Sequence, residues 1–185
     1  MSKKKIGIFV GSLRRDSYSK IVANYVKGKA PEGFEFSIID ISNLPIYNQD
    51  FDDDGTPPAE YNDFRAKLKP LDGFIFVTPE YNRSVPAILK NALDVGSRPY
   101  GQNSWDGKPG GIISVSIGNI SGFGANHHLR QSMTFLNVLM LQQPEAYLGH
   151  IADSLDSNNN IVKGTADFLD SFVKAYVEWV NKIVK

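Results

Sequence analysis

The feature that most constrains the fold of this chain is a repeated alternation of short apolar runs with helical patterns. Nearly continuous apolar runs cover 6–10, 73–77 and 111–117, and weaker runs cover 34–39 and 146–148. Runs of this length are typical of strands that are buried on both faces of a parallel sheet. The sequence therefore predicts an α/β fold in which five parallel strands alternate with five helices, and the helices cover both faces of the sheet.

The helices are predicted from apolar periodicity and from capping residues. Ser17 is placed to cap the first helix and Ser84 the third, where Pro86 would fall in the first turn. Residues 2–5 are too polar to extend the first strand. Five helices are expected. The first begins near Ser17, the second covers 59–68, and the third runs from Ser84 to Gly96. The fourth contains Leu129, Met133, Leu136 and Met140, and the fifth covers 168–183.

The size and charge of the chain limit its function. Its 185 residues suit a single domain spanning 1–185, and Lys plus Arg balances Asp plus Glu at 20 each. A neutral chain has no net field to recruit nucleic acid or an anionic membrane. Cysteine is absent, which removes disulfides and thiolate sites, and no apolar stretch approaches the roughly 20 residues of a membrane helix. No signal peptide is visible, so we expect a cytoplasmic enzyme.

A long loop at 41–58 follows the second strand. It carries the acidic run Asp52 to Asp54 among glycine and proline residues. Adjacent carboxylates raise the possibility of a metal site, but they lack regular ligand spacing. We prefer the interpretation that the run is solvated. Loops of this length are often functional or mobile.

The loop from Gly11 to Lys20 joins the first strand to the first helix and is rich in serine and arginine. The free N–H groups and the dipole of a helix N-terminus favour a phosphate there, serine hydroxyls can donate to it, and an arginine can bind it bidentately. A plainer alternative is that Ser17 only caps the helix and both arginines are solvated. The next glycine after Gly11 is Gly28, which supports neither a dinucleotide fingerprint nor a Walker loop.

Two more unusual loops follow the third and fourth strands, at 78–82 and 116–124. In an open sheet with the flavodoxin-like order 2-1-3-4-5, ligands bind beyond the carboxyl ends of the strands, at the switch point between strands one and three. The loops after strands one, three and four would therefore converge on a single crevice.

Three motifs in these loops carry a family resemblance. They are G-S-L-R-R-D-S-Y-S from Gly11, T-P-E-Y-N-R-S-V-P-A-I-L-K-N-A-L-D over 78–94, and S-I-G-N-I-S-G-F-G-A-N-H-H-L-R-Q over 116–131. Together they resemble the NADPH-dependent FMN reductase family, which includes quinone, azo-dye and chromate reductases. The resemblance implies a flavodoxin-like fold, bound FMN, a homodimer or a homotetramer built as a dimer of dimers, and electron transfer from NAD(P)H to a small acceptor.

The resemblance also implies roles for residues at matching positions. The phosphate would be held by Ser12, Arg14, Ser17, Tyr18 and Ser19, the isoalloxazine would be lined by Pro79, Glu80, Tyr81 and Asn82, and the site would be closed by Ser116. Ser121-Gly122 departs from the Gly-Gly of many members, which bears on the shape of that loop and of the acceptor pocket beside it.

Several polar and aromatic residues near these motifs have more than one interpretation. Glu80 could act as a base, but hydride transfer to a flavin needs none, and we prefer a role in organising the loop or an interface. His127 and His128 are interpreted as helix-surface or subunit-contact residues rather than as acids or ligands. Tyr81 and Tyr100 are equally consistent with ring-stacking walls and with ordinary half-buried aromatics.

Three functions are consistent with these features. The first is an FMN-dependent NAD(P)H oxidoreductase that works by a ping-pong mechanism on quinones, azo compounds or free flavin. The second is a flavodoxin-type electron carrier for protein partners, which would be expected to have a strongly acidic face that this neutral chain lacks. The third is a regulatory module without flavin. The sequence favours the first.

Overall fold

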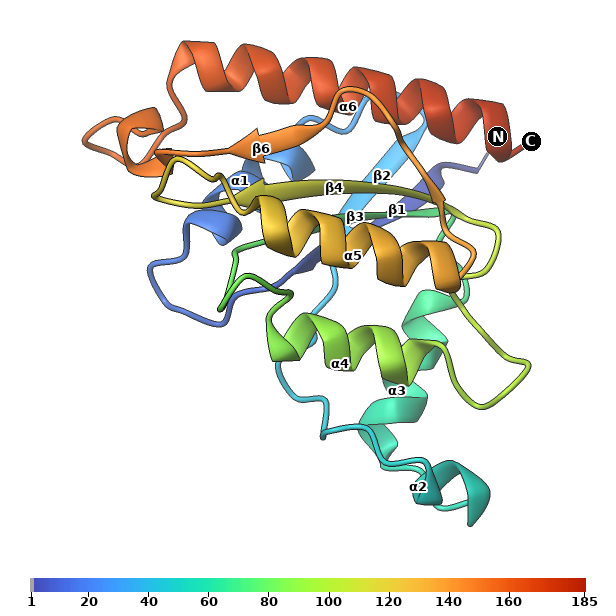
Figure 1. Cartoon of the computed structure of the whole chain (residues 1–185). Coiled ribbons are helices and arrows are strands. Elements are labelled where there is room, and N and C mark those ends of the chain that lie inside the picture. Colours follow the sequence, from blue (N-terminus) through green and yellow to red (C-terminus); the bar gives the residue numbers. More distant parts are fainter. Residues whose placement is uncertain (1) are drawn as a thin grey trace.

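A parallel sheet with the strand order β2-β1-β3-β4-β5 forms the centre of the protein, and β6 pairs with β4 alongside β5 (Figure 1). The computed structural model describes residues 2–185. The strands are β1 (Lys4–Val10), β2 (Phe34–Ile38), β3 (Gly73–Thr78), β4 (Pro109–Val115), β5 (Leu139–Met140) and β6 (Ala146–Leu148). The helices are α1 (Tyr18–Gly28), α2 (Asp50–Asp53), α3 (Ala59–Leu68), α4 (Ala87–Gly96), α5 (Phe123–Phe135), α6 (Lys163–Ile183) and the short 3-10 helix η1 (Ile151–Ser154).

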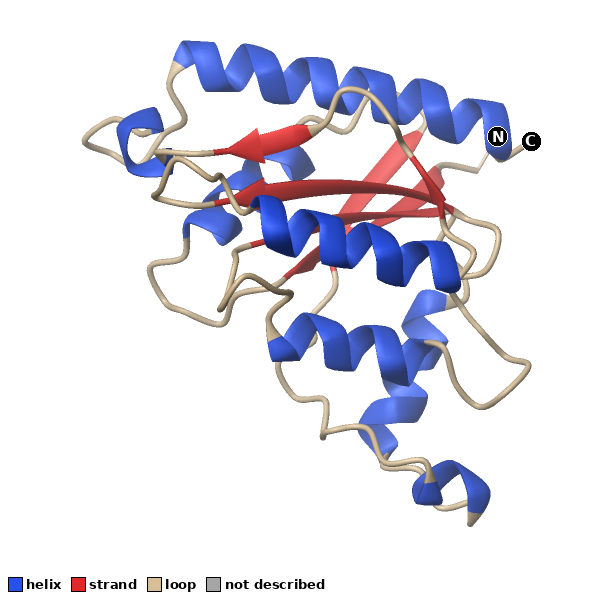
Figure 2. Cartoon of the chain, viewed as in Figure 1, coloured by secondary structure: helices blue, strands red, loops and turns tan. Residues whose placement is uncertain are grey.

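The predicted three-layer, flavodoxin-like architecture is confirmed. Helices α1 and α6 cover one face of the sheet, and α3, α4 and α5 cover the other (Figures 1 and 2). Alternate residues of β1 enter the two cores: Ile6 and Ile8 pack with α1 and α6, whereas Phe9 packs on the opposite side. All these side chains are fully buried, which explains why the strand has a continuous apolar run.

Trp105 forms the centre of the second core, although it comes from the loop before β4. It is fully buried, its Nε1–H donates to the Leu93 carbonyl at 3.0 Å, and its ring lies 4.8 Å from Phe74 and 5.3 Å from Phe9. Gly96 permits this approach, because a Cβ there would lie 2.7 Å from the indole ring. The end of α4 is therefore packed directly on the tryptophan.

The predicted start of the first helix is confirmed and that of α4 is wrong. Ser17 caps α1, accepting a hydrogen bond from the Lys20 N–H at 3.3 Å. The N-cap of α4 is Pro86, whereas Ser84 closes a tight turn with Tyr81. A serine directly before a helical pattern is a good cap candidate, but here the turn takes its backbone instead.

The limits of two elements also differ from the prediction. Strand β1 includes Lys4 and Lys5, because their backbones pair with β2, while the Lys5 side chain is exposed and the Lys4 ammonium donates to Asn181 and Val184 at the C-terminus. Helix α5 ends at Phe135, so Met140 lies in β5 instead of continuing the helix. Two short strands, β5 and β6, thus share the fifth position of the sheet, where the sequence predicted one.

The long loop at 41–58 is held to the body of the protein by buried polar contacts. The Asn91 side chain accepts from the Tyr47 N–H at 2.8 Å and donates to the Pro45 carbonyl at 2.9 Å. Within the loop, α2 presents Asp52 to Arg65, and both Arg65–Asp52 hydrogen bonds measure 2.7 Å. The acidic run is therefore partly structural, and residues 2–185 contain no group of three or more potential metal ligands.

The Asp52–Arg65 pair should be important for stability. Only 8% of the Arg65 side chain and 5% of the Asp52 side chain are exposed. We expect Asp52→Ala to lower the free energy of unfolding by about 3–5 kcal/mol, because it leaves a buried guanidinium unpaired. Asp54→Ala, two residues away and exposed, should change it by less than about 0.5 kcal/mol. Urea unfolding measures both, and equal midpoints for the two variants would contradict the assignment.

Candidate active site

The loops that follow β1, β3 and β4 meet at the carboxyl edge of the sheet, as the topology predicted (Figure 1). The Gly11 N–H donates to the Val77 carbonyl at 2.9 Å, so the first loop leaves β1 in contact with β3. A Cβ on Gly11 would lie only 3.2 Å from the Pro79 ring. The first two loops are therefore packed directly against one another.

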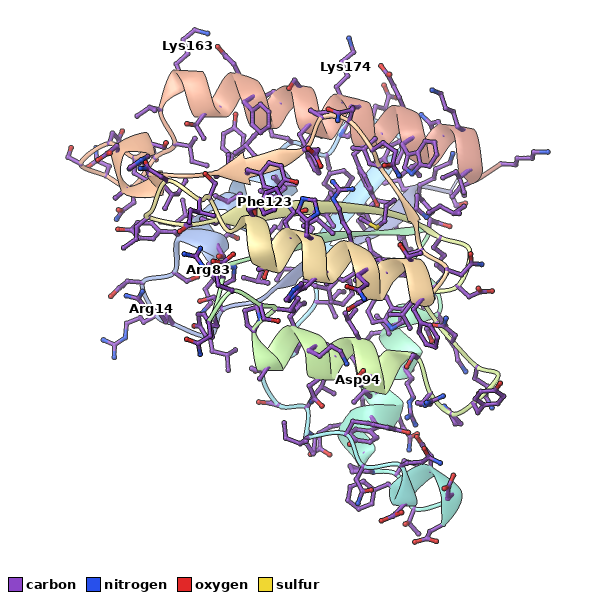
Figure 3. The ribbon with its side chains drawn as sticks, viewed as in Figure 1. Arg14, Arg83, Asp94, Phe123, Lys163 and Lys174 are labelled. Atoms are coloured by element: carbon purple, nitrogen blue, oxygen red, sulfur yellow. The ribbon has the colours of Figure 1, made fainter. Side chains whose placement is uncertain are left out.

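The first loop presents a row of free backbone donors. Within the described residues 2–185, no backbone N–H from Ser12 to Ser19 donates to a protein acceptor. The side chains of Ser12, Ser17 and Ser19 are buried beside these groups at the start of α1. Arg14 and Arg15 are exposed, and Arg14 projects outward from the loop (Figure 3). This combination of donors and a helix N-terminus is suited to an anion such as a phosphate.

The loop after β3 forms a two-residue turn between Tyr81 and Ser84. The N–H of each of these residues donates to the carbonyl of the other, at 3.1 and 3.0 Å. The two central residues are left-handed, with φ of 50° at Asn82 and 63° at Arg83. Both values are those of a type I′ turn, which glycine usually occupies at its second central position. A non-glycine residue held in this region carries backbone strain of about 1–3 kcal/mol.

Glu80 joins this turn to the N-terminus of α5. Its Oε2 accepts from the Ala125 N–H at 3.1 Å, and its Oε1 pairs with the Arg83 guanidinium at 2.8 Å. His128 on α5 makes a second contact, since its Nδ1 lies 3.0 Å from the Ser84 hydroxyl. The side chain of Glu80 thus organises this loop, which is one of the two roles expected from the sequence.

The loop after β4 has the shape that a Gly-Gly sequence would favour, although Ser121 replaces the first glycine. Ser121 has a φ of 58° and Gly122 a φ of 71°. The Ser121 hydroxyl donates to the Asn119 carbonyl at 3.0 Å, which stabilises this strained residue. Ser116 lies at the base of the loop, and its hydroxyl accepts from the Gly118 N–H at 3.1 Å.

The two consecutive histidines both lie on the surface of α5, as expected. His127 Nε2 is 3.0 Å from the Tyr147 hydroxyl, which in turn donates to Glu145 at 2.9 Å. Burial, reinforced by the Glu145 carboxylate, raises the pKa of the Tyr147 phenol. The Phe123 ring lies against that of His127, with a centroid separation of 4.0 Å and an angle of 34° between the rings, so these side chains form an exposed cluster at the start of α5.

The two tyrosines left open by the sequence are separated by the structure. Tyr81 is part of the turn at the carboxyl edge and is 48% exposed. Tyr100 is 91% exposed and lines a different feature, a groove of about 790 Å³ between α4 and α5. The groove is also lined by Val85, Leu93, Phe135 and His128.

One contact at the carboxyl edge could not be predicted from the sequence. His150, after β6, pairs with the side chain of Asn119 in the third loop. Its φ of 45° places it in the left-handed region. A lone histidine in a loop gives no sequence signal for such a contact, because the two residues are 31 positions apart.

The comparison with known families identifies the family of the chain. The model of the NADPH-dependent FMN reductase family matches residues 4–153. The chain belongs to this family. Members use FMN and NAD(P)H, so the protein is an FMN-dependent NAD(P)H oxidoreductase, as the sequence predicted, rather than an electron carrier.

Individual relatives agree with this membership. A quinone reductase from Pseudomonas putida is 47% identical over 176 residues, covering 95% of this chain and 94% of the relative. A 2-hydroxy-1,4-benzoquinone reductase from a Burkholderia species is 45% identical, with 96% of each chain covered. The solved structure of FerB, a flavoenzyme NAD(P)H:(acceptor) oxidoreductase from Paracoccus denitrificans, has a TM-score of 0.89 at 36% identity, covering 97% of this chain and 98% of FerB.

The fold has wider relatives as well. A flavodoxin from Pseudomonas aeruginosa, solved as a point mutant, has a TM-score of 0.58 at 18% identity, covering 94% of this chain and 99% of the flavodoxin, and it shares the fold.

None of the helices within residues 2–185 is long and apolar enough to cross a membrane.

Proposed function

We propose that FMN binds at the carboxyl edge, across the three loops. The supporting observation is the row of unpartnered N–H groups from Ser12 to Ser19 at the start of α1, where a phosphate would receive hydrogen bonds and meet the positive end of the helix dipole. The proposed contacts are Ser12, Arg14, Ser17, Tyr18 and Ser19 for the phosphate, Pro79, Glu80, Tyr81 and Asn82 along the isoalloxazine, and Ser116 at the far side.

The chain binds and orients the flavin. The bound flavin would supply the chemistry, because it can accept a hydride and pass on electrons. The tight turn keeps the N–H groups of Asn82 and Arg83 free of protein acceptors within the described residues, so they are available to the pyrimidine edge of the ring. Such donors stabilise negative charge that develops there on reduction. No side chain needs to act as a general base or a nucleophile.

Arg14 is the residue through which the phosphate assignment is most simply tested. We expect Arg14→Ala to weaken FMN binding roughly ten- to a hundredfold, because a charge-assisted contact contributes about 1.5–3 kcal/mol. Arg15→Ala, at the neighbouring exposed position, is the matched control and should have a smaller effect. Titration of the apoprotein with FMN measures both affinities. An unchanged affinity in Arg14→Ala would refute the role of this residue.

We propose quinones as the preferred acceptors, with azo compounds and free flavin as further substrates. The names of the Pseudomonas putida and Burkholderia relatives support the choice of a quinone. A flat acceptor would stack on the exposed flavin ring and be selected only loosely by its shape. This supports a broad range of electron acceptors. NAD(P)H and the acceptor would approach the same crevice, so they would bind in turn.

Use of one crevice by both substrates predicts ping-pong kinetics. Initial rates measured against NADPH at several fixed quinone concentrations should give parallel double-reciprocal lines. The physical reason is that the nicotinamide must leave before the quinone can reach the same face of the ring. Lines that intersect would instead indicate a ternary complex and a second substrate pocket.

We propose that the protein is a homodimer, or a homotetramer built from such dimers, that pairs through the groove between α4 and α5. Phe135 on the rim of this groove is 90% exposed and Tyr100 is 91% exposed. Two such exposed aromatic side chains beside a groove of mixed polar and apolar lining are characteristic of a surface that is covered in an assembly. The neutral chain and its need for NAD(P)H support a cytoplasmic enzyme without a nucleic-acid partner.

The dimer can be tested by its mass. Light scattering at micromolar concentration should give at least twice the 20.5 kDa of one chain. Phe135→Glu should shift the mass toward the monomer, because it places a charge in the apolar part of the interface. Val162→Glu, at another exposed apolar position at the start of α6, should leave the mass unchanged. A wild-type mass equal to the 20.5 kDa of a single chain would contradict the proposal.

A further inference from the structure

Helix α5 begins without a capping side chain of its own. Its N-cap is Gly122, which has no side chain to accept a hydrogen bond. The Glu80 carboxylate from the neighbouring loop takes this place, since it accepts from the N–H of Ala125, the third residue of the helix. This is the N–H to which a local capping side chain commonly binds. The negative charge also lies at the positive end of the helix dipole.

The fit between Glu80 and α5 is close. A Cβ on Gly124 would lie 2.9 Å from Glu80 Oε2 and 2.8 Å from the Arg83 carbonyl. The turn and the first turn of α5 can therefore touch only because this position is glycine. The side chain of Glu80 is 12% exposed, whereas that of its ion-pair partner Arg83 is 65% exposed. The contact with α5 is the enclosed one, and the ion pair is at the surface.

We propose that Glu80 is a positioning residue. By capping α5, which lies far away in the sequence, it fixes the position of the Tyr81–Ser84 turn relative to the loop after β4. The proposal rests on the assignment of the isoalloxazine to these two loops. If the turn supplies N–H donors to the ring, their direction depends on this contact, because within residues 2–185 the other hydrogen bond between the turn and α5 is the one between Ser84 and His128. The acceptor oxygen of Glu80 is the essential group, and the surface ion pair is not.

Three substitutions separate these contributions. Glu80→Ala removes the acceptor and should weaken FMN binding to the apoprotein at least tenfold. Glu80→Gln keeps an oxygen that can accept from Ala125 and should restore the affinity to within about threefold of wild type. Arg83→Gly removes the ion pair, keeps the backbone N–H and places glycine where a type I′ turn prefers it, so its loss of affinity should be smaller than that of Glu80→Ala.

A fourth substitution disturbs the contact without altering Glu80. Gly124→Ala inserts a methyl group between α5 and the turn and should weaken FMN binding in the same direction as Glu80→Ala. Circular dichroism and thermal unfolding of each apoprotein show whether the fold is retained. Because two unrelated substitutions disrupt the same contact, misfolding of one variant leaves the other to decide.

The midpoint potential of bound FMN distinguishes positioning from a purely structural role. Glu80→Gln and Glu80→Ala both remove the charge, so the difference between them reports the acceptor alone. If misdirected N–H donors weaken binding of reduced FMN tenfold more than binding of oxidised FMN, the potential of Glu80→Ala falls about 30 mV below that of Glu80→Gln. A cap that served only stability would lower the unfolding temperature and leave the two potentials equal.

The results also separate this proposal from the site assignment. Loss of FMN affinity in Arg14→Ala and Glu80→Ala, with rescue by Glu80→Gln, supports both. Loss in Arg14→Ala with wild-type affinity and potential in Glu80→Ala refutes the positioning role and keeps the phosphate site. Wild-type affinity in both variants refutes the proposed FMN site itself.

Discussion

Parallel pairing of β1 between β2 and β3, and of β3 with β4, is the constraint on which the candidate site depends. Ile8 lies opposite Ile38 on one side and Ile75 on the other, and Val77 lies opposite Ile113. With the strands in this register, the three loops end at one edge, where single contacts join them. A Cβ on Gly11 would touch the Pro79 ring, and Glu80 accepts a hydrogen bond from Ala125 in the first turn of α5. The site is therefore a product of topology, and each loop alone would be an ordinary connection.

The layers of the fold could be predicted because buried parallel strands have a simple signature. The run at Phe74, Phe76 and their neighbours is apolar on both faces, since one face packs under α1 and α6 and the other under α3 to α5. Trp105 could not be placed in the same way. It occurs in a glycine-containing loop, and its burial depends on partners such as Phe9 in the first strand of the chain. Local periodicity does not carry that information.

In the candidate site, too, features set by neighbouring residues could be predicted, and features set by distant contacts could not. Ser17 as a helix cap and the anion-binding character of the first loop follow from neighbouring residues, and the structure agrees on the cap. The turn at Asn82 and Arg83 lacks the glycine that normally signals a type I′ geometry, so its shape was not predictable. The placement of Ser84 as a cap failed for the same reason. Contacts between separate elements, such as Glu80 with Ala125 of α5, join residues 45 positions apart and need the fold to bring them together.

The central claim is that FMN lies across the carboxyl edge with its phosphate at the start of α1. The most direct measurement is a crystal structure of the FMN-loaded enzyme. We expect the phosphate oxygens within hydrogen-bond distance of backbone N–H groups between Ser12 and Ser19, and the ring against the Tyr81–Ser84 turn. A flavin bound instead in the groove between α4 and α5, with the Ser12–Ser19 N–H groups still unpartnered, would contradict the account.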